Sequence, residues 1–94
     1  MDFDKALGSA VRMVRLSKGL TQEFFSVISS RTHISRLENG RKKPFVVTIN
    51  DLAKAMEVHP LTVLTQAYLI QSRDMSLEDL QKLVQHEINQ LEKT

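Results

Sequence analysis

The chain has 94 residues, 41% of them apolar, with a net charge of +2, no cysteine and no tryptophan. This length fits one domain with at most one appended element, and the lack of cysteine excludes a disulfide framework, a thiolate metal site and a cysteine nucleophile. No apolar run reaches the roughly 20 residues that span a bilayer. The acidic start, MDFDKALG, is unlike a signal peptide, so we expect a cytoplasmic protein.

Residues 4–19 predict a first helix. Asp4 is placed to cap its start, and Gly19 to end it in the left-handed conformation that glycine tolerates. Apolar residues recur at helical spacing and give the helix one inward face: Leu7, Ala10, Val11 and Val14.

A short second helix is predicted to follow. Thr21 is placed to cap it, and we expect it to run from Gln22 to about Ile28, with Phe25 and Ile28 facing inward. The Ser29-Ser30 pair ends it, because serine side chains compete for backbone hydrogen bonds and favour turns.

The third predicted helix begins after Ser30, its cap, and ends near Glu38. Only Ile34 and Leu37 are spaced to face inward. The outer side chains are short polar groups and guanidinium groups: Ser30, Arg31, Thr32, His33, Ser35 and Arg36. Asn39-Gly40 stops the helix, and a basic loop, RKKP, follows. Such a face suits the major groove of DNA, where each base pair shows its own pattern of donors and acceptors.

Two further helices and a linker are predicted over residues 46–75. Thr48 or the residues just before it open the fourth helix, whose inward stripe is Ile49, Leu52, Ala53 and Met56. Pro60 suits the first turn of a fifth helix, which ends near Ile70. Residues 71–75 are the predicted linker.

A sixth helix is predicted near the end of the chain. Ser76 caps it, and Asp79 three residues later resembles an acidic form of the capping box. Its apolar stripe is Leu77, Leu80, Val84, Ile88 and Leu91. A short helix is marginal alone and needs a packing partner. We favour a second copy in a dimer over the chain's own helices or a different protein.

The charge divides unevenly along the chain. Residues 1–73 hold 11 Lys and Arg against 6 Asp and Glu, a net charge of +5, and residues 74–94 hold 2 against 5, a net charge of −3. A basic region joined to an acidic tail predicts a polyanion-binding module with an attached element that does not touch the polyanion. Ordinary solvated surface charge is the alternative interpretation.

Residues from Leu7 to Leu64 resemble the lambda-repressor-like family of helix-turn-helix regulators, also called Xre or Cro-like. Three blocks carry the resemblance in the family's order: LGSAVRMVRLSKGLTQ, ISRLENGRKKP and TINDLAKAMEVHPLTVL. The resemblance implies an all-α fold with a five-helix lambda-repressor-like DNA-binding domain, which we place at residues 1–70. The linker and the additional C-terminal amphipathic helix, residues 71–94, would form a dimerisation element through Leu77, Leu80, Val84, Ile88 and Leu91.

The resemblance also implies roles for particular residues. Base reading falls to Arg31, Thr32 and Arg36, since arginine makes bidentate contacts to guanine. Contacts to the DNA backbone are expected from Gln22, Ser30, His33, Ser35, Asn39, Arg41, Lys42 and Lys43. Arg15 and Glu38 are expected to form a structural ion pair that ties the first helix to the end of the third.

Two features depart from the family pattern. The segment around Ser29-Ser30 is shorter than usual and lacks the turn glycine, so the second helix must end early or the turn must be rebuilt. Residues 45–47, Phe-Val-Val, are more apolar than usual. We expect one of these valines in the core and Phe45 exposed or at an interface.

The predicted function is that of a sequence-specific regulator, a repressor or autoregulator of bacterial or phage origin that works at the nucleoid. It would bind double-stranded DNA as a homodimer on a near-palindromic operator. The alternative is an antitoxin-type interaction module whose C-terminal helix binds a partner protein. No enzyme, metal, cofactor or membrane partner is expected: His33, His59 and His86 lie on three different segments, and the three isolated glycines form no phosphate loop.

Overall fold

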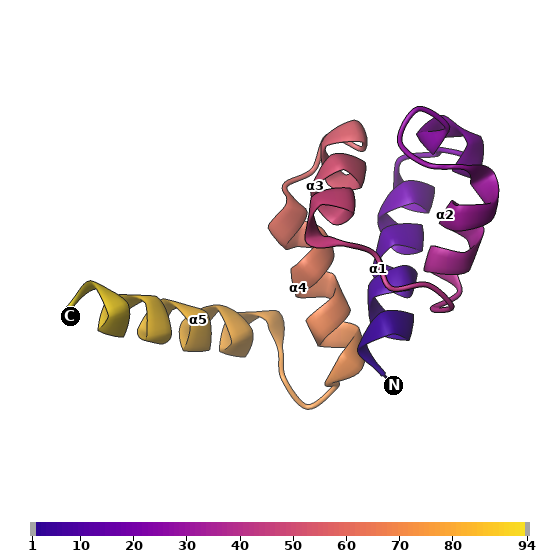
Figure 1. Cartoon of the computed structure of the whole chain (residues 1–94). Helices are drawn as coiled ribbons and strands as arrows, with labels where there is room; N and C mark the ends of the chain where they lie inside the picture. Colours follow the sequence, from indigo (N-terminus) through magenta and orange to yellow (C-terminus); the bar gives the residue numbers. More distant parts are fainter. Residues whose placement is uncertain (1, 94) are drawn as a thin grey trace.

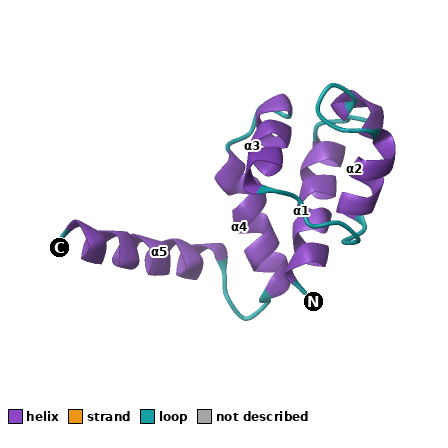
Figure 2. Cartoon of the chain, in the orientation of Figure 1, coloured by secondary structure: helices purple, strands orange, loops and turns teal. Residues whose placement is uncertain are grey.

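The structure is a computed structural model that describes residues 2–93, and every regular element in this range is helical. The elements are α1 (Phe3–Ser17), the 3-10 helix η1 (Gln22–Phe25), α2 (Arg31–Glu38), α3 (Val46–Ala55), α4 (Pro60–Gln71) and α5 (Leu77–Glu92). Helix α1 lies between α4 and α2, and α3 packs beside α4 (Figure 1). The all-α class predicted from the sequence is confirmed, as the colouring by secondary structure shows (Figure 2).

One hydrophobic core joins α1, η1, α2, α3 and α4. Its largest fully buried side chains are Phe25, Ile34, Leu52, Met56, Val11 and Val63. The inward stripes predicted for the first four helices supply most of these, and Val14 and Ile28 are partly buried against them. A fully buried side chain of this size contributes about 1.5–3 kcal/mol relative to its exposed state. The core therefore fixes the short α2 from beneath.

Helix α1 begins earlier than the sequence predicted. Asp2, and not Asp4, is its cap, because the Asp2 carboxylate accepts a hydrogen bond from the Lys5 backbone N–H at 2.9 Å. Asp4 lies in the first turn, where a negative charge complements the helix dipole. Both aspartates have the chemistry of a cap. Phe3 is the first helical residue and packs on Tyr68 of α4, with ring centroids 4.9 Å apart, and this contact favours the earlier start.

The second helix is shorter and tighter than predicted. It ends at Phe25 instead of Ile28, and Thr21 makes no side-chain capping bond. The backbone N–H groups of Ile28 and Ser29 both donate to the Phe25 carbonyl, at 2.8 and 2.9 Å, and so turn the chain. Phe25 must reach the core and Ser30 must cap α2. The segment between them, residues 26–29, adopts turn and bend conformations instead of continuing the helix.

The predicted burial of a valine in residues 45–47 is wrong. Phe45, Val46 and Val47 are 80%, 80% and 69% exposed. Helix α3 starts at Val46, and the first of its side chains to reach the core is that of Ile49. The first turn of α3 projects beyond the core, so its side chains are exposed although they are apolar.

Helix α5 runs away from the bundle (Figure 1). It starts with the predicted capping box: Ser76 Oγ accepts from the Asp79 N–H at 3.1 Å, and the Asp79 carboxylate accepts from the Ser76 N–H at 3.5 Å. It contains no buried residue. None of the helices within residues 2–93 combines the length and the apolar character that a bilayer crossing requires.

Three helices end in the same backbone motif, with one residue in the left-handed conformation. Gly19 and Gly40 occupy this position after α1 and α2, at φ values of 68° and 73°. After α3 it is occupied by Glu57, at a φ of 61°, and the Val58 N–H donates back to the Ala53 carbonyl at 3.0 Å. A left-handed conformation costs a residue with a Cβ roughly 1–2 kcal/mol. The end of α3 therefore stores strain that the other two ends avoid.

We predict that Glu57→Gly stabilises the protein by roughly 0.5–1 kcal/mol, because the strain that it relieves exceeds the entropy cost of glycine. The side chain of Glu57 is exposed, so little packing is lost. Thermal unfolding should show a rise in Tm of a few degrees, on the scale of about 4–8 °C per kcal/mol for a domain of this size. Glu57→Ala, which keeps the Cβ, serves as the control. An equal rise in Tm for the alanine variant would contradict the explanation.

Candidate nucleic-acid interface

Helix α2 presents a polar face directed away from the core. Ile34 and Leu37 are buried beneath it. Thr32 and Arg36 are four residues apart, on the side opposite the two buried side chains, and both are exposed. Ser30 caps the helix as predicted, since its hydroxyl accepts from the His33 N–H at 3.2 Å. Cap and core together aim this face at solvent.

The three expected base readers are all exposed, but their surroundings differ. Arg31 Nη1 lies 3.4 Å from Glu23 Oε1 of η1, in an ion pair whose two side chains are largely exposed. Thr32 and Arg36 make no side-chain hydrogen bond or ion pair within residues 2–93. Exposed ion pairs are weak, about 0–1 kcal/mol, so Glu23 restrains Arg31 only lightly. Helical periodicity does not predict this contact, because it crosses a turn between two helices.

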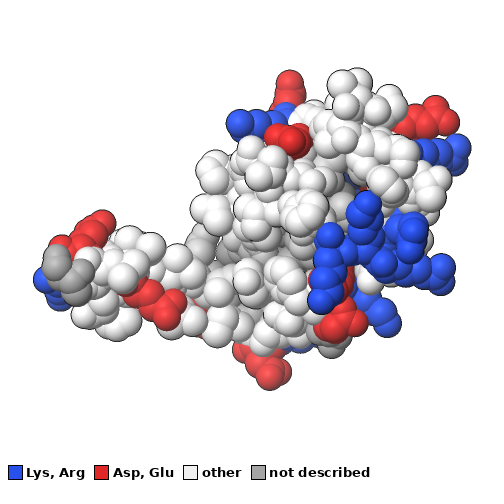
Figure 3. All heavy atoms as spheres, viewed as in Figure 1, with Lys and Arg blue, Asp and Glu red and all other residues white. Residues whose placement is uncertain are grey.

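The residues expected to bind the DNA backbone surround the same face. Those at exposed positions are Ser30, His33, Asn39, Arg41 and Lys43, and those at half-buried positions are Ser35 and Lys42. Lys and Arg atoms gather over the end of α2 and the loop that follows it (Figure 3). The acidic residue within this segment, Glu38, is buried, so the surface beside α2 is left positive.

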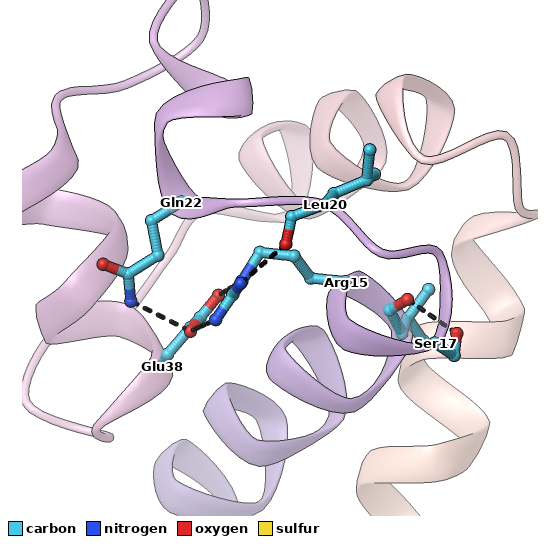
Figure 4. Close-up of polar contacts among 6 residues, drawn as sticks. Arg15, Ser17, Leu20, Gln22 and Glu38 are labelled. Carbon is cyan, nitrogen blue, oxygen red and sulfur yellow. Dashed lines mark hydrogen bonds and ion pairs between the residues drawn. The ribbon is translucent and has the colours of Figure 1, made fainter.

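A buried ion pair joins α1 to the end of α2. Arg15 Nε lies 2.7 Å from Glu38 Oε2, and Arg15 Nη2 lies 2.9 Å from Glu38 Oε1 (Figure 4). The two residues are 7% and 5% exposed. Hydrogen bonding to Glu38 raises the pKa of Arg15 above its ordinary value, although burial acts to lower it. The guanidinium therefore stays charged, and the parallel hydrogen bonds fix both side chains in one geometry.

Two neighbours complete the hydrogen bonding of this pair. Arg15 Nη1 donates to the Leu20 carbonyl at 2.8 Å, and Gln22 Nε2 donates to Glu38 Oε1 at 3.1 Å (Figure 4). Among the described residues, every buried side-chain nitrogen and oxygen has a partner. Gln22, the residue expected to clasp the DNA backbone, is thus half-buried and bonded inward. An amide nitrogen carries two hydrogens, so one N–H remains available to a phosphate.

Gly8 allows α1 and α2 to approach closely enough for the ion pair to form. A Cβ at this position would collide with the Leu37 carbonyl oxygen and lie 2.8 Å from that of Glu38. The sequence pattern does not point to Gly8, because a glycine within a helix adds nothing to the apolar periodicity. Only the packing of two helices reveals its role.

A family model described as helix-turn-helix matches residues 11–63, from the second half of α1 to the start of α4. The chain belongs to the helix-turn-helix family. The resemblance carried by the three sequence blocks is thereby confirmed. The chain is also 40% identical over 67 residues to an uncharacterized HTH-type transcriptional regulator, y4dJ, of Sinorhizobium fredii, which covers 69% of this chain and 87% of the relative.

Two crystal structures of the clp gene regulator ClgR from Corynebacterium glutamicum share the fold. One has a TM-score of 0.73 at 27% identity, covering 77% of this chain and 96% of ClgR. The other has a TM-score of 0.74 at 26% identity, covering 93% of this chain and 95% of ClgR. The chain is therefore a DNA-binding transcriptional regulator of the helix-turn-helix type and not an enzyme. Within residues 2–93, no three His, Cys, Asp or Glu side chains are grouped to hold a metal ion.

We predict that Arg15→Met destabilises the protein by roughly 3–5 kcal/mol, because Glu38 would remain buried without its partner. Urea unfolding followed by circular dichroism measures the loss. The double variant Arg15→Met with Glu38→Leu should recover most of it, since neither charge is then buried. Arg12→Met, at an exposed arginine of the same helix, is the control and should be near neutral. Additive losses in the double variant would contradict the coupling of the two side chains.

Proposed function

We propose that the protein acts as a homodimer that binds a near-palindromic operator and represses transcription, including that of its own gene. The observation that carries most weight is the outer face of α2, where Thr32 and Arg36 point away from the core beside the basic loop. A short, firmly anchored helix with this face fits the major groove. The buried Arg15–Glu38 pair would hold α2 in a fixed position on the bundle.

Within this proposal, Arg36 is the principal base reader. Its guanidinium has no partner among residues 2–93 and extends from the outermost face of α2, next to Thr32. Arg31 would act as a second base reader, because its exposed ion pair with Glu23 is weak enough to give way to DNA. Arg41, Lys42 and Lys43 would neutralise phosphates. Phosphate contacts set position and affinity, and base contacts set specificity.

The dimer is supported by the exposed apolar stripe of α5. Leu77, Val84 and Ile88 are each about half exposed, at 47%, 48% and 47%. The alignment with one ClgR structure covers 93% of the chain, more than residues 1–76 supply, so it extends into α5. Two copies related by a two-fold axis present two α2 helices to the DNA, and such an arrangement reads an inverted repeat.

Repression needs only that the dimer occupy an operator overlapping a promoter, so that polymerase is excluded. A reporter gene placed under the promoter of the gene that encodes this protein tests the proposed repression. Expression of the wild-type protein should lower the signal, and expression of an Arg36→Ala variant should not. A signal that rises with the wild-type protein would reverse the proposed sign of regulation.

We predict that Arg36→Ala weakens binding to an operator selected from random DNA by about 10- to 100-fold, the equivalent of 1–3 kcal/mol for a lost bidentate contact. Binding to unrelated duplex should change much less. Lys43→Ala should weaken both and reduce the salt dependence by about one unit of slope, because one phosphate contact is lost. Arg73→Ala, in the exposed loop before α5, is the charge-matched control. Equal losses on operator and unrelated DNA would remove Arg36 from the base readers.

We predict that Val84→Glu converts the dimer to a monomer, because it places a charge in the centre of the apolar stripe of α5. Light scattering measures the mass. The Tm of the helical bundle should stay the same, since Val84 is not part of the core. Gln85→Glu adds the same charge beside the stripe and should leave the mass unchanged. A dimer that survives Val84→Glu would assign dimerisation to another surface.

A further inference from the structure

We propose that α5 pairs with α5 of a second copy in antiparallel orientation, with the two Val84 side chains meeting at the two-fold axis. This inference rests on the proposed homodimer and adds its orientation and register. The observation behind it is the spacing of the stripe. Successive stripe residues, Leu77, Leu80, Val84, Ile88 and Leu91, are 3, 4, 4 and 3 positions apart. This pattern reads the same in both directions around Val84, and the exposed Leu83 lies outside it, about 100° around the helix from Val84.

An antiparallel pair of α5 helices places every residue of this symmetric stripe opposite another residue of the stripe. With Val84 on the axis, Leu80 faces Ile88 of the partner subunit, and Leu77 faces Leu91 of the partner subunit. Each apolar residue of the stripe then meets an apolar residue. The antiparallel arrangement also sets the positive end of each helix dipole beside the negative end of the other, which is favourable.

A parallel pair fits the same helix less well. If Leu77 is position a of a heptad, Leu80 is position d and Val84 is position a of the next heptad. The next d position is then Glu87. Two parallel helices would bring the two Glu87 carboxylates together in the seam and leave Ile88 at its edge. In the antiparallel register the two Glu87 residues are six positions apart along the axis, about 9 Å. Charge therefore favours the antiparallel pair.

The stripe is accessible to a second copy. Leu77, Val84 and Ile88 are about half exposed, and α5 extends away from the bundle (Figure 1). Because the bundle joins α5 at its N-terminal end, an antiparallel pair places the two DNA-binding bundles at opposite ends of the pair. The half-sites of the operator would then lie further apart than in a dimer formed directly between bundles.

The cysteine-free chain allows a direct test by disulfide trapping. Single variants Val84→Cys, Leu80→Cys and Ile88→Cys are prepared in the full chain, the last with a tag that separates it by size. Each is equilibrated in a glutathione redox buffer and analysed on a non-reducing gel. His86→Cys, on the opposite side of α5, measures random collision. A disulfide needs Cα atoms within about 7 Å, and two antiparallel Leu80 positions are eight residues, about 12 Å, apart along the axis.

We expect Val84→Cys to cross-link with itself, Leu80→Cys to cross-link with Ile88→Cys in a mixture, and Leu80→Cys alone to stay at the level of His86→Cys. Self-cross-linking of Leu80→Cys together with Val84→Cys would overturn the antiparallel register and leave the homodimer standing. A dimeric mass without any cross-link through α5 would overturn the pairing of α5 and keep dimerisation by another face. A monomeric mass without cross-links would overturn both the pairing and the proposed homodimer, and leave α5 for a different protein.

Discussion

The position of α2 depends on the bidentate pairing of Arg15 with Glu38. Helix α2 has eight residues, and a helix of this length is not stable by itself in water. Its centre is held by the burial of Ile34 and Leu37, and its last residue is held by the guanidinium from α1. A buried ion pair adds little net stability, because both charges must lose their hydration. It fixes instead one angle and one register between the two helices.

The surrounding structure protects that geometry. Gly8 lets the backbones of α1 and α2 approach, and the Leu20 carbonyl and the Gln22 amide complete the hydrogen bonds of the pair. Through Gln22 the same network reaches the start of η1. The shortened turn before α2 is therefore anchored at both of its ends, by Phe25 in the core and by the Ser30 cap. The loss of a helical turn in the second helix leaves α2 supported.

The basic surface beside α2 and the apolar stripe of α5 lie on different helices. Lys and Arg side chains gather over the end of α2 and the loop that follows it (Figure 3), where the exposed Phe45, Val46 and Val47 come next in the chain, and the stripe of α5 lies apart from them. A surface for DNA and a surface for a second copy would thus be distinct. Substitutions in one should leave the other intact, a property that makes the proposed roles separable by experiment.

Much of the fold follows from local sequence alone. The apolar periodicity predicts the helices, and Ser30, Gly40 and Ser76 mark helix ends, because caps depend on the chemistry of one or two residues. The family resemblance also points to the segment that carries the polar face, and the individual contacts of Arg31, Thr32 and Arg36 with DNA stay predictions.

Tertiary structure decides what depends on distant partners. Asp2 caps α1 in place of Asp4 because Phe3 packs on Tyr68. Helix η1 ends at Phe25 because that side chain is buried in the core. Val46 and Val47 are exposed because the core does not extend to the first turn of α3. Two further features depend on tertiary structure. Glu57 adopts a left-handed conformation where α3 ends before α4. The contact of Glu23 with Arg31 crosses a turn between two helices. Sequence periodicity reports which residues share a face, and only the assembled core determines where that face ends.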